Sequence, residues 1–298
     1  MTASTDSTYD SAMAPSRALQ AGPATSGKAL EIGDGFRALA FREKDFGGAM
    51  DPLVLVDHYR MTRPTFGAHP HAGLSAVSLL FEDSKGRFHN RDSLGNDFDL
   101  MPGDLYWLQA GSGVIHDESP RPGSHIHGLQ VFVNLPSAAR KSRPTSLHVG
   151  AAEIPTHEDT GCRVRVVLGE SNGIAGRKSP GLPMTILDGH IDSSATVSHL
   201  LKEQESAWIY AVAGELVLTI GGREIRLLSG QSVALAPDRT DALLWLKNPG
   251  EEQAHFALFA ARPINEAFVQ KGPFVMDSAA DIARVEADYA SGKLGNLT

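Results

Sequence analysis

The sequence predicts an all-β protein built from two related β-barrels in tandem. From about residue 29 onward, short apolar segments alternate with turn signals such as "MPGD", "AGSG", "IGGRE" and "LSGQ". Turns every eight to twelve residues or so between segments rich in Val, Leu and Ile are typical of β-sandwiches and β-barrels. A weak internal repeat of strand, turn, strand, turn and strand occurs in each half. Two such units explain the length of 298 residues, which exceeds the usual size of one domain.

The order of segments along the chain follows from composition. Residues 1–28 are rich in Ala, Ser, Thr and Pro and are expected to form a flexible tail. The first barrel is expected over residues 29–140 and the second over residues 160–262. The connection between them lies within residues 136–161, which are rich in polar and turn-forming residues. Residues 263–298 form a C-terminal segment.

One clear helix is predicted in that C-terminal segment, within residues 277–292. Ser278 followed by Asp281 resembles a capping box at its start. Its larger apolar side chains recur at helical spacing: Ile282, Val285 and Tyr289. We expect this helix to have a packing role.

Composition narrows the classes of function. The net charge of -8 argues against a protein that binds nucleic acid or anionic lipid through bulk electrostatics. The single cysteine, Cys162, excludes an intrachain disulfide and a thiolate metal cage. The N-terminal residues lack the basic start and apolar core of a secretory signal, and no later stretch reaches about 18 consecutive apolar residues. A cytoplasmic protein without membrane contact is therefore expected.

Two stretches that contain histidine have the geometry of a metal site. In "FGAHPHAGLSAV", His69 and His71 are two residues apart, so on a strand both point to one face while Pro70 points to the other. In "GVIHDESP", His116 and Glu118 share a face in the same way. Three neutral imidazoles and one carboxylate would suit Fe(II), Mn, Co, Ni, Cu or Zn. The residues alone do not select one of these metals.

A chain with 12 histidines also contains such pairs by chance. His125 and His127 in "GSHIHGLQVFV" are an alternative ligand pair, and spacing alone does not choose between the pairs. Taken alone, each pair is better explained as solvated or structural histidines. Context favours His69 with His71, because they and the "VIHDES" stretch flank a complete set of predicted strands. His125 and His127 instead follow the loop "SPRPGS".

At these residues the sequence resembles the pirin family, a group of bicupins in the cupin superfamily. The matching stretches are "HPHAG", "HNRDSLGN", "MPGDLYWLQAGSGVIHDE", "HGLQVFVNLP" and "RPINEAFVQKGPFVMDSAADI", spread from about residue 57 to 295. The resemblance implies two face-to-face antiparallel β-barrels of the double-stranded β-helix, or jelly-roll, type with a short C-terminal helix. It also implies one divalent metal, most simply Fe(II), in the N-terminal barrel, and a metal-free C-terminal barrel.

The H-P-H and H-x-E motifs of the family map onto four residues, which the resemblance makes the metal ligands: His69, His71, His116 and Glu118. It places His127 and His89 outside the ligand set. The second half has no counterpart of His116 after "SGQSVALAPD". Its remaining histidines form no close pairs: His190, His199 and His255.

Three residues just after the first histidine pair depart from the family pattern H-P-H-R-G-[FM]-E-T. Ala72, Leu74 and Ser75 stand where Arg, a larger apolar residue and Glu are usual. None of these departures removes a ligand. Loss of a charged pair beside the site would nevertheless alter its electrostatics, so the departures bear on substrate and partner more than on fold.

The resemblance implies a metal-dependent dioxygenase that cleaves quercetin-like flavonols with O2 and releases carbon monoxide. Glu118 would reduce the net charge of the metal site and act as the catalytic base for the phenolic proton. The alternative is a non-enzymatic, redox-sensing regulatory protein that uses the same iron site and a protein partner, as a transcriptional cofactor or a modulator of a metabolic enzyme. A cupin-type sugar-phosphate isomerase is disfavoured, because no clear cluster of Lys and Arg could hold a phosphate.

Overall fold

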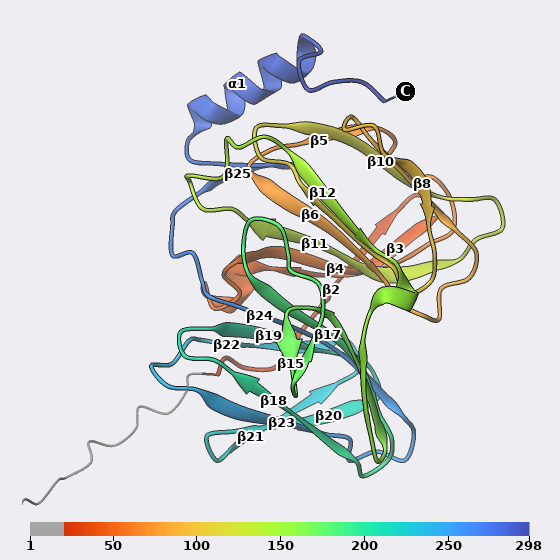
Figure 1. The fold of residues 1–298 in the computed structure, drawn as a ribbon, viewed down its shortest axis with the longest axis vertical. Coiled ribbons are helices and arrows are strands. Elements are labelled where there is room, and N and C mark those ends of the chain that lie inside the picture. The colour runs from red at the N-terminus through yellow and green to blue at the C-terminus, as the bar shows by residue number, and fades with distance from the viewer. Residues whose placement is uncertain (1–20, 298) are drawn as a thin grey trace, which may run out of the picture.

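The computed structural model describes residues 21–297, so residues 1–20 of the expected N-terminal tail lie outside the described residues. Strands dominate the described part of the chain, which confirms the all-β prediction (Figure 1). The predicted C-terminal helix is present as α1 (Ala279–Ala290), with Ser278 at its N-cap accepting a hydrogen bond from the backbone of Asp281. Two short 3-10 turns, η1 (Glu43–Phe46) and η2 (Ala151–Glu153), interrupt the strands.

The N-terminal unit consists of two antiparallel sheets and is called the N-terminal sandwich below. The large sheet has seven strands, in the spatial order β12 (Thr145–Val149), β9 (Leu105–Gln109), β6 (Leu74–Leu80), β11 (Ile126–Asn134), β4 (Leu53–Met61), β3 (Phe36–Arg42) and β2 (Lys28–Ile32). The small sheet has four, in the order β5 (His69–His71), β10 (Val114–Pro120), β7 (Phe88–Asp92) and β8 (Asp97–Leu100). Side chains from both sheets share one core, among them Tyr59, Leu80, Phe88 and Val114.

The C-terminal unit repeats this plan and is called the C-terminal sandwich. Its large sheet has the order β1 (Thr25–Ser26), β22 (Gln231–Leu235), β19 (Ser206–Ala213), β24 (Ala254–Ala261), β17 (Met184–Ile191), β14 (Cys162–Leu168) and β13 (Thr156–Asp159). Its small sheet has the order β18 (Thr196–Leu201), β23 (Ala242–Lys247), β20 (Glu215–Ile220) and β21 (Arg223–Leu228). A short hairpin, β15 (Glu170–Ser171) and β16 (Ile174–Ala175), lies beside it. The internal repeat in the sequence therefore corresponds to two sandwiches of the same construction.

The two large sheets pack face to face in the middle of the molecule (Figure 1). Their shared core includes Val77, Trp107 and Val131 from one sheet and Trp208 and Phe259 from the other. A sheet that lies between two cores must be apolar on both faces. Accordingly, β6 and β24 are buried at every position. The layer order is small sheet, large sheet, large sheet, small sheet.

The chain crosses between the sandwiches three times within residues 21–297, and the first two crossings lie near residue 27 and within residues 136–161. The described chain starts in the C-terminal sandwich, where β1 pairs with β22, and then enters the N-terminal sheet at β2. Within residues 136–161, β12 still pairs in the N-terminal large sheet, whereas β13 pairs in the C-terminal one.

The C-terminal segment returns to the N-terminal sandwich. It forms the hairpin β25 (Val269–Lys271) and β26 (Phe274–Met276), followed by α1, and packs Phe274, Met276 and Ile282 against Ala72. Arg140 is fully buried and holds this segment through an ion pair with Asp277 and a hydrogen bond to the carbonyl of Ala267. The residues that follow the H-P-H motif are thus covered by the end of the chain.

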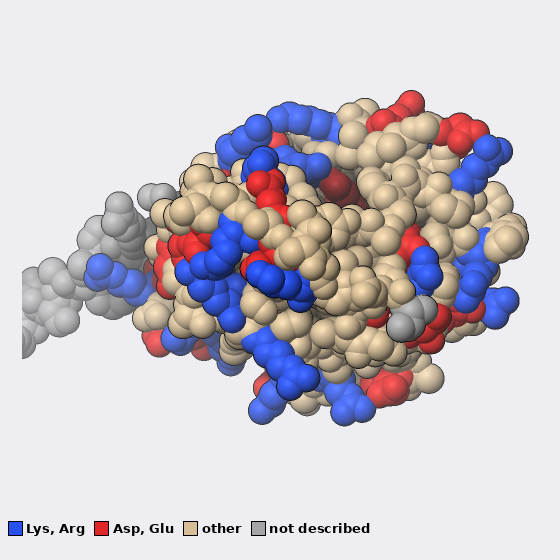
Figure 2. Space-filling model, turned by 90° about the horizontal axis from the view of Figure 1, so that it is seen from above, with Lys and Arg blue, Asp and Glu red and all other residues tan. Residues whose placement is uncertain are grey.

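Charges of both signs are mixed on the face seen in Figure 2. On the face seen in Figure 2, Lys and Arg side chains lie among Asp and Glu side chains rather than in one basic area. Within residues 21–297 no helix is long and apolar enough to cross a bilayer.

A buried polar cluster joins the two sandwiches. Arg165, which is 1% exposed, donates to Asp188 at 2.8 Å and to the carbonyl of Gly103 in the other sandwich. His255 Nε2 lies 2.6 Å from the second carboxylate oxygen of Asp188. Burial alone would raise the pKa of Asp188, but the bond to His255 and the charge of Arg165 hold it at about 2.

We predict that Asp188→Asn lowers the free energy of unfolding by about 3 kcal/mol near neutral pH, because it leaves the buried Arg165 with only the partly exposed Glu82, 3.7 Å away, as its counter-ion. The folded pKa lies below the unfolded value, so this contribution is complete above about pH 4 and is lost as the pH falls toward 2. Urea unfolding at neutral and acid pH measures both effects, and the difference between wild type and variant should shrink in acid. Asp192→Asn, an exposed carboxylate, is the control and should change stability little. Equal effects of the two substitutions would contradict the prediction.

A second prediction concerns Gly73, between the H-P-H motif and β6. Its φ is +74°, and a Cβ there would lie 1.7 Å from the carbonyl oxygen of Val275 in β26. Gly73→Ala should therefore displace the C-terminal hairpin and lower the free energy of unfolding by more than the 1 to 3 kcal/mol or so of backbone strain alone. Gly123→Ala is the matched control, since Gly123 has φ +80° and open space around it. Thermal unfolding of both variants checks the prediction, which fails if they are equally destabilised.

Candidate metal centre

A cavity of about 220 Å³ lies between the two sheets of the N-terminal sandwich. One wall comes from β4, whose alternate residues Leu55, Asp57, Tyr59 and Met61 all line it. This follows from the pleat of a strand, which sends successive side chains to opposite faces. His58 accordingly points away, toward the other sandwich, where its Nδ1 lies 2.6 Å from the hydroxyl of Tyr210.

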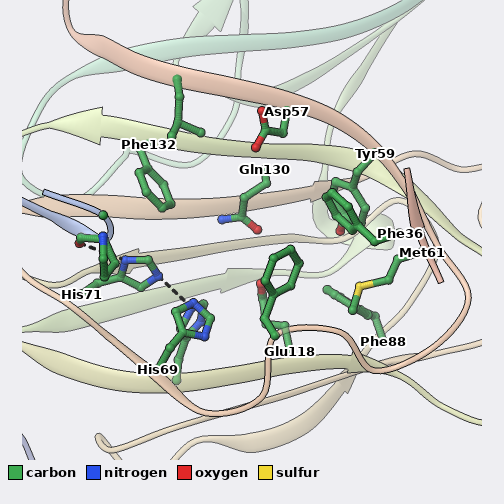
Figure 3. Close-up of a pocket in the computed structure, with 15 residues that line it drawn as sticks. Phe36, Asp57, Tyr59, Met61, His69, His71, Phe88, Glu118, Gln130 and Phe132 are labelled. Carbon is green, nitrogen blue, oxygen red and sulfur yellow. Dashed lines mark hydrogen bonds between the residues drawn. The ribbon is translucent and has the colours of Figure 1, made fainter. Parts of the chain in front are cut away.

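Three histidines meet at one end of this cavity, and Figure 3 labels two of them, His69 and His71. β10 pairs antiparallel with β5, and the register places His116 opposite His69. His116 Nε2 lies 3.0 Å from His69 Nε2 and 2.9 Å from His71 Nε2. Among the residues that the structure describes, these three form the group whose possible ligand atoms all lie within 4.8 Å of one another.

In His69 and His71, the hydrogen bond of Nδ1 determines that Nε2 is the nitrogen that faces the centre. His69 Nδ1 lies 2.8 Å from the carbonyl of Gly67, and His71 Nδ1 lies 3.3 Å from the carbonyl of Pro273. A carbonyl only accepts, so both Nδ1 atoms carry the proton and both Nε2 atoms are bare lone pairs. His116 could donate from Nε2 to one of them but not to both. The Nε2 atoms of His69 and His71 therefore present converging lone pairs, and that of His116 adds a third when its proton is on Nδ1, which has no hydrogen-bond partner among the described residues.

Burial keeps His71 and His116 neutral. Burial, followed by the charge of His69, lowers the pKa of His71 to about 3. Burial and the neighbouring His71 and His69 hold the pKa of His116 well below its ordinary value. Neutral imidazole is the form that binds a metal. Lone pairs that point at one another repel, whereas a cation between them would be attracted by each.

Glu118 lines the same cavity, but its carboxylate is not among the ligand atoms grouped with the three histidines. Instead Ser78 Oγ donates to its two oxygens, at 2.7 and 2.8 Å. Burial raises the pKa of Glu118 to about 7, with the hydrogen bond from Ser78 opposing the rise. As the sequence pattern indicates, Glu118 and His116 point to the same face of β10, and Asp117 points outward to Arg91.

The other histidines lie elsewhere. His127 Nε2 is 2.6 Å from His58 Nε2, and its Nδ1 is 2.6 Å from the carboxylate of Asp83, between the two sandwiches. His125 is exposed and forms a backbone bridge with Lys85. Five more have side-chain partners: His89 with Asp97, His148 with Asp104, His199 with Ser171, His255 with Asp188, and His190 stacked on His255. Within the described residues, the C-terminal sandwich brings no three ligand groups together.

The three departures from the family pattern do not line the cavity. Ala72 packs against Phe274 and Met276, and Leu74 packs against Val275, so both face the C-terminal hairpin. Ser75 is fully buried on the same strand. Two of the three departures, Ala72 and Leu74, therefore lie against the returning end of the chain.

The sequence patterns did not point to Ser78, Gln130 and Pro273. Ser78 is a polar residue inside the apolar strand "LSAVSLL", and period-two alternation from Phe132 would have placed Gln130 on the cavity face of β11. Pro273 meets His71 from 202 positions away in the sequence, which no local signal reveals.

Comparisons with solved structures show the same fold. Quercetin 2,3-dioxygenase from Acinetobacter baumannii aligns over 96% of this chain and 100% of its own with a TM-score of 0.80 and 26% identity. The GK1651 protein of Geobacillus kaustophilus aligns over 84% of this chain and 99% of its own with a TM-score of 0.74 and 26% identity.

Comparisons with known protein sequences identify the family. Residues 38–133 match the family described as Pirin, and residues 186–295 match the Pirin C-terminal cupin domain. Pirin of Rattus norvegicus is 31% identical over 247 residues, which cover 83% of this chain and 83% of the rat protein. With matches in both sandwiches and this identity over most of its length, the chain belongs to the pirin family.

Proposed function

We propose that this chain is a metal-dependent dioxygenase that cleaves quercetin-like flavonols with O2. The observation that carries the proposal is the convergence of three imidazole Nε2 atoms at one end of an apolar cavity that also holds a buried carboxylate. Membership of the pirin family and likeness to the quercetin 2,3-dioxygenase of Acinetobacter baumannii support the same reaction class.

His69, His71 and His116 would hold one divalent metal. Fe(II) is the simplest choice, and Mn, Co, Ni, Cu or Zn are compatible with imidazole ligands. A metal bound there would supply Lewis acidity that lowers the pKa of a phenol. The resemblance to the family also makes Glu118 a fourth ligand, which would require its carboxylate to turn away from Ser78.

Aromatic side chains shape the rest of the cavity for a flat ligand. Phe132 packs edge-on to His71 with ring centroids 5.0 Å apart, and Phe36 packs edge-on to Phe66 at 5.0 Å. Figure 3 shows Phe36 and Tyr59 at the end of the cavity away from His69 and His71. A planar aromatic ring system would bury its faces against these side chains, which excludes water and orients its oxygens toward the histidines.

Glu118 is proposed as the base that takes the proton of the flavonol 3-hydroxyl. It lies in the same cavity as the histidines, and its pKa of about 7 suits proton transfer near neutral pH. The flavonol anion then reacts with O2, its heterocyclic ring is cleaved, and carbon monoxide leaves. The chain's own tasks are to orient the phenol, to accept its proton and to exclude water.

We predict that purified protein with metal will remove quercetin absorbance in air and release carbon monoxide. His69→Ala should lose both the metal and the turnover while its far-ultraviolet circular dichroism stays that of the wild type. His125→Ala removes an exposed histidine outside the cavity and should retain both. Elemental analysis, absorbance and a carbon monoxide assay measure these outcomes. Full metal occupancy without flavonol loss would contradict the dioxygenase and favour the redox-sensing regulatory alternative.

Glu118→Gln separates the two roles of Glu118. An amide of the same shape cannot accept a proton at neutral pH, so we expect the variant to retain metal but to lose turnover by about 100-fold or more. Metal content and initial rates are measured on the same sample. Loss of the metal together with the activity would instead identify Glu118 as a ligand.

A further inference from the structure

The outer face of the small sheet in the C-terminal sandwich is apolar at its centre. Trp245 on β23 is 44% exposed, and Leu243 on the same strand is 45% exposed. Leu200 of β18 lies directly opposite Leu243 in the register and is 39% exposed. Side chains alternate along a strand, so Leu244 and Leu246 enter the core while these three point outward. The three, Leu200, Leu243 and Trp245, are called the β23 patch below. Figure 1 shows their sheet at the end of the molecule opposite α1.

The equivalent face of the N-terminal sandwich carries charge instead. At its small sheet the exposed side chains form ion pairs: Arg91 with Asp117, Arg87 with Asp99, and Arg121 with Asp99. The two sandwiches share one plan, so the fold itself does not require an apolar outer face on either small sheet. Single exposed apolar side chains are common on proteins, whereas contiguous ones mark an interaction site. The β23 patch is therefore a candidate contact surface.

Two charges of opposite sign flank the patch. Lys247 lies two residues beyond Trp245 on β23, and Glu224 on β21 lies level with Trp245 on the far side of β20. Both are exposed, and neither forms an ion pair within residues 21–297. Arg226 on the same face is, in contrast, paired with Glu215. The face therefore presents an apolar centre with one free positive and one free negative side chain beside it.

We propose that the β23 patch is the surface through which two copies of this chain associate face to face, with Lys247 of each copy against Glu224 of the partner subunit. A contact of a surface with its own copy about a two-fold axis must be complementary to itself. A two-fold axis in the plane of the face, through Trp245 and midway between the directions to Lys247 and Glu224, brings opposite charges together twice. The patch lies in the other sandwich from the three histidines, so this contact does not depend on the proposed reaction.

The energetics of the contact also favour a second copy. Large aromatic side chains at the centre of an interface contribute much of its binding energy, and Trp245 has that position here. Packing of one sheet on another is the contact that already joins the two sandwiches within the chain. Charge pairs at the rim of the patch fix the relative orientation of the copies.

The experiment measures association and the covering of Trp245 together. Sedimentation velocity over a range of protein concentrations gives the Kd of the dimer. Iodide quenching of tryptophan fluorescence reports on the patch, because the other two tryptophans, Trp107 and Trp208, are buried. We expect quenching to fall as the dimer forms. Trp245→Ser should raise the Kd by about 30-fold or more.

A matched pair of leucines makes the result specific to this face. Leu200→Ser should raise the Kd by about fivefold or more, because it removes apolar area from the contact. Leu94 has nearly the same exposure, 38%, but lies in the N-terminal sandwich. Leu94→Ser should therefore leave the Kd unchanged. All these side chains are at the surface, so each variant should keep the circular dichroism of the wild type.

Reversal of the two flanking charges tests the two-fold arrangement. Lys247→Glu alone, or Glu224→Lys alone, places like charges opposite each other and should raise the Kd by about tenfold. The double reversal restores the attraction across the axis and should return the Kd to near the wild-type value.

Four outcomes would overturn the proposal. A wild type that stays monomeric up to its limit of solubility, with Trp245 freely quenched, leaves the face to a different partner. A monomer in which iodide never reaches Trp245 has the patch covered by another part of its own chain. A dimer with the same Kd after Trp245→Ser associates through another face. A double charge reversal that binds no better than the single ones refutes the pairing of Lys247 with Glu224.

Discussion

The burial of both faces of the two large sheets is the constraint on which the other features depend. One face of each sheet forms the core between the sandwiches, and the other face forms the interior of its own sandwich. Each strand of these sheets therefore sends alternate side chains to two different environments. On β4 this separates Asp57 and Tyr59, which line the cavity, from His58, which pairs with Tyr210 of the other sandwich. One wall of the cavity and the interface between the sandwiches are therefore opposite faces of one sheet.

The electrostatics of the site follow from the same burial. Placing the imidazoles together in an apolar cavity lowers the pKa of His71 and of His116, by desolvation and by repulsion from the neighbouring imidazoles. The cavity thus keeps the nitrogens in the form that a metal requires. The same desolvation acts in the opposite direction on Glu118, since burial raises the pKa of a carboxyl group. The same buried cavity therefore keeps His71 and His116 neutral and raises the affinity of Glu118 for a proton.

The end of the chain completes the centre. The hairpin of β25 and β26 brings the carbonyl of Pro273 to His71 and the backbone of Val275 against Gly73. Metal-binding histidines commonly depend on such a partner for the second ring nitrogen, because it sets the tautomer and the ring orientation. The small side chain of Ala72, where the family usually has Arg, lies beneath this hairpin. This departure from the family pattern therefore lies in the packing beneath the hairpin that contacts His71, and not among the residues that line the cavity.

The sequence by itself determined the class of fold, the two-unit plan, the C-terminal helix, and the pairs His69 with His71 and His116 with Glu118 on common faces. These follow from local periodicity, because a strand repeats every two residues and a helix every 3.6 or so. Only the tertiary structure decided that the three histidines converge, that Glu118 accepts a hydrogen bond from Ser78, and that His127 joins His58 rather than the centre. The physical reason is register: which residue lies opposite which is set by pairing and packing between strands far apart in the chain, and periodicity within one strand carries no information about it.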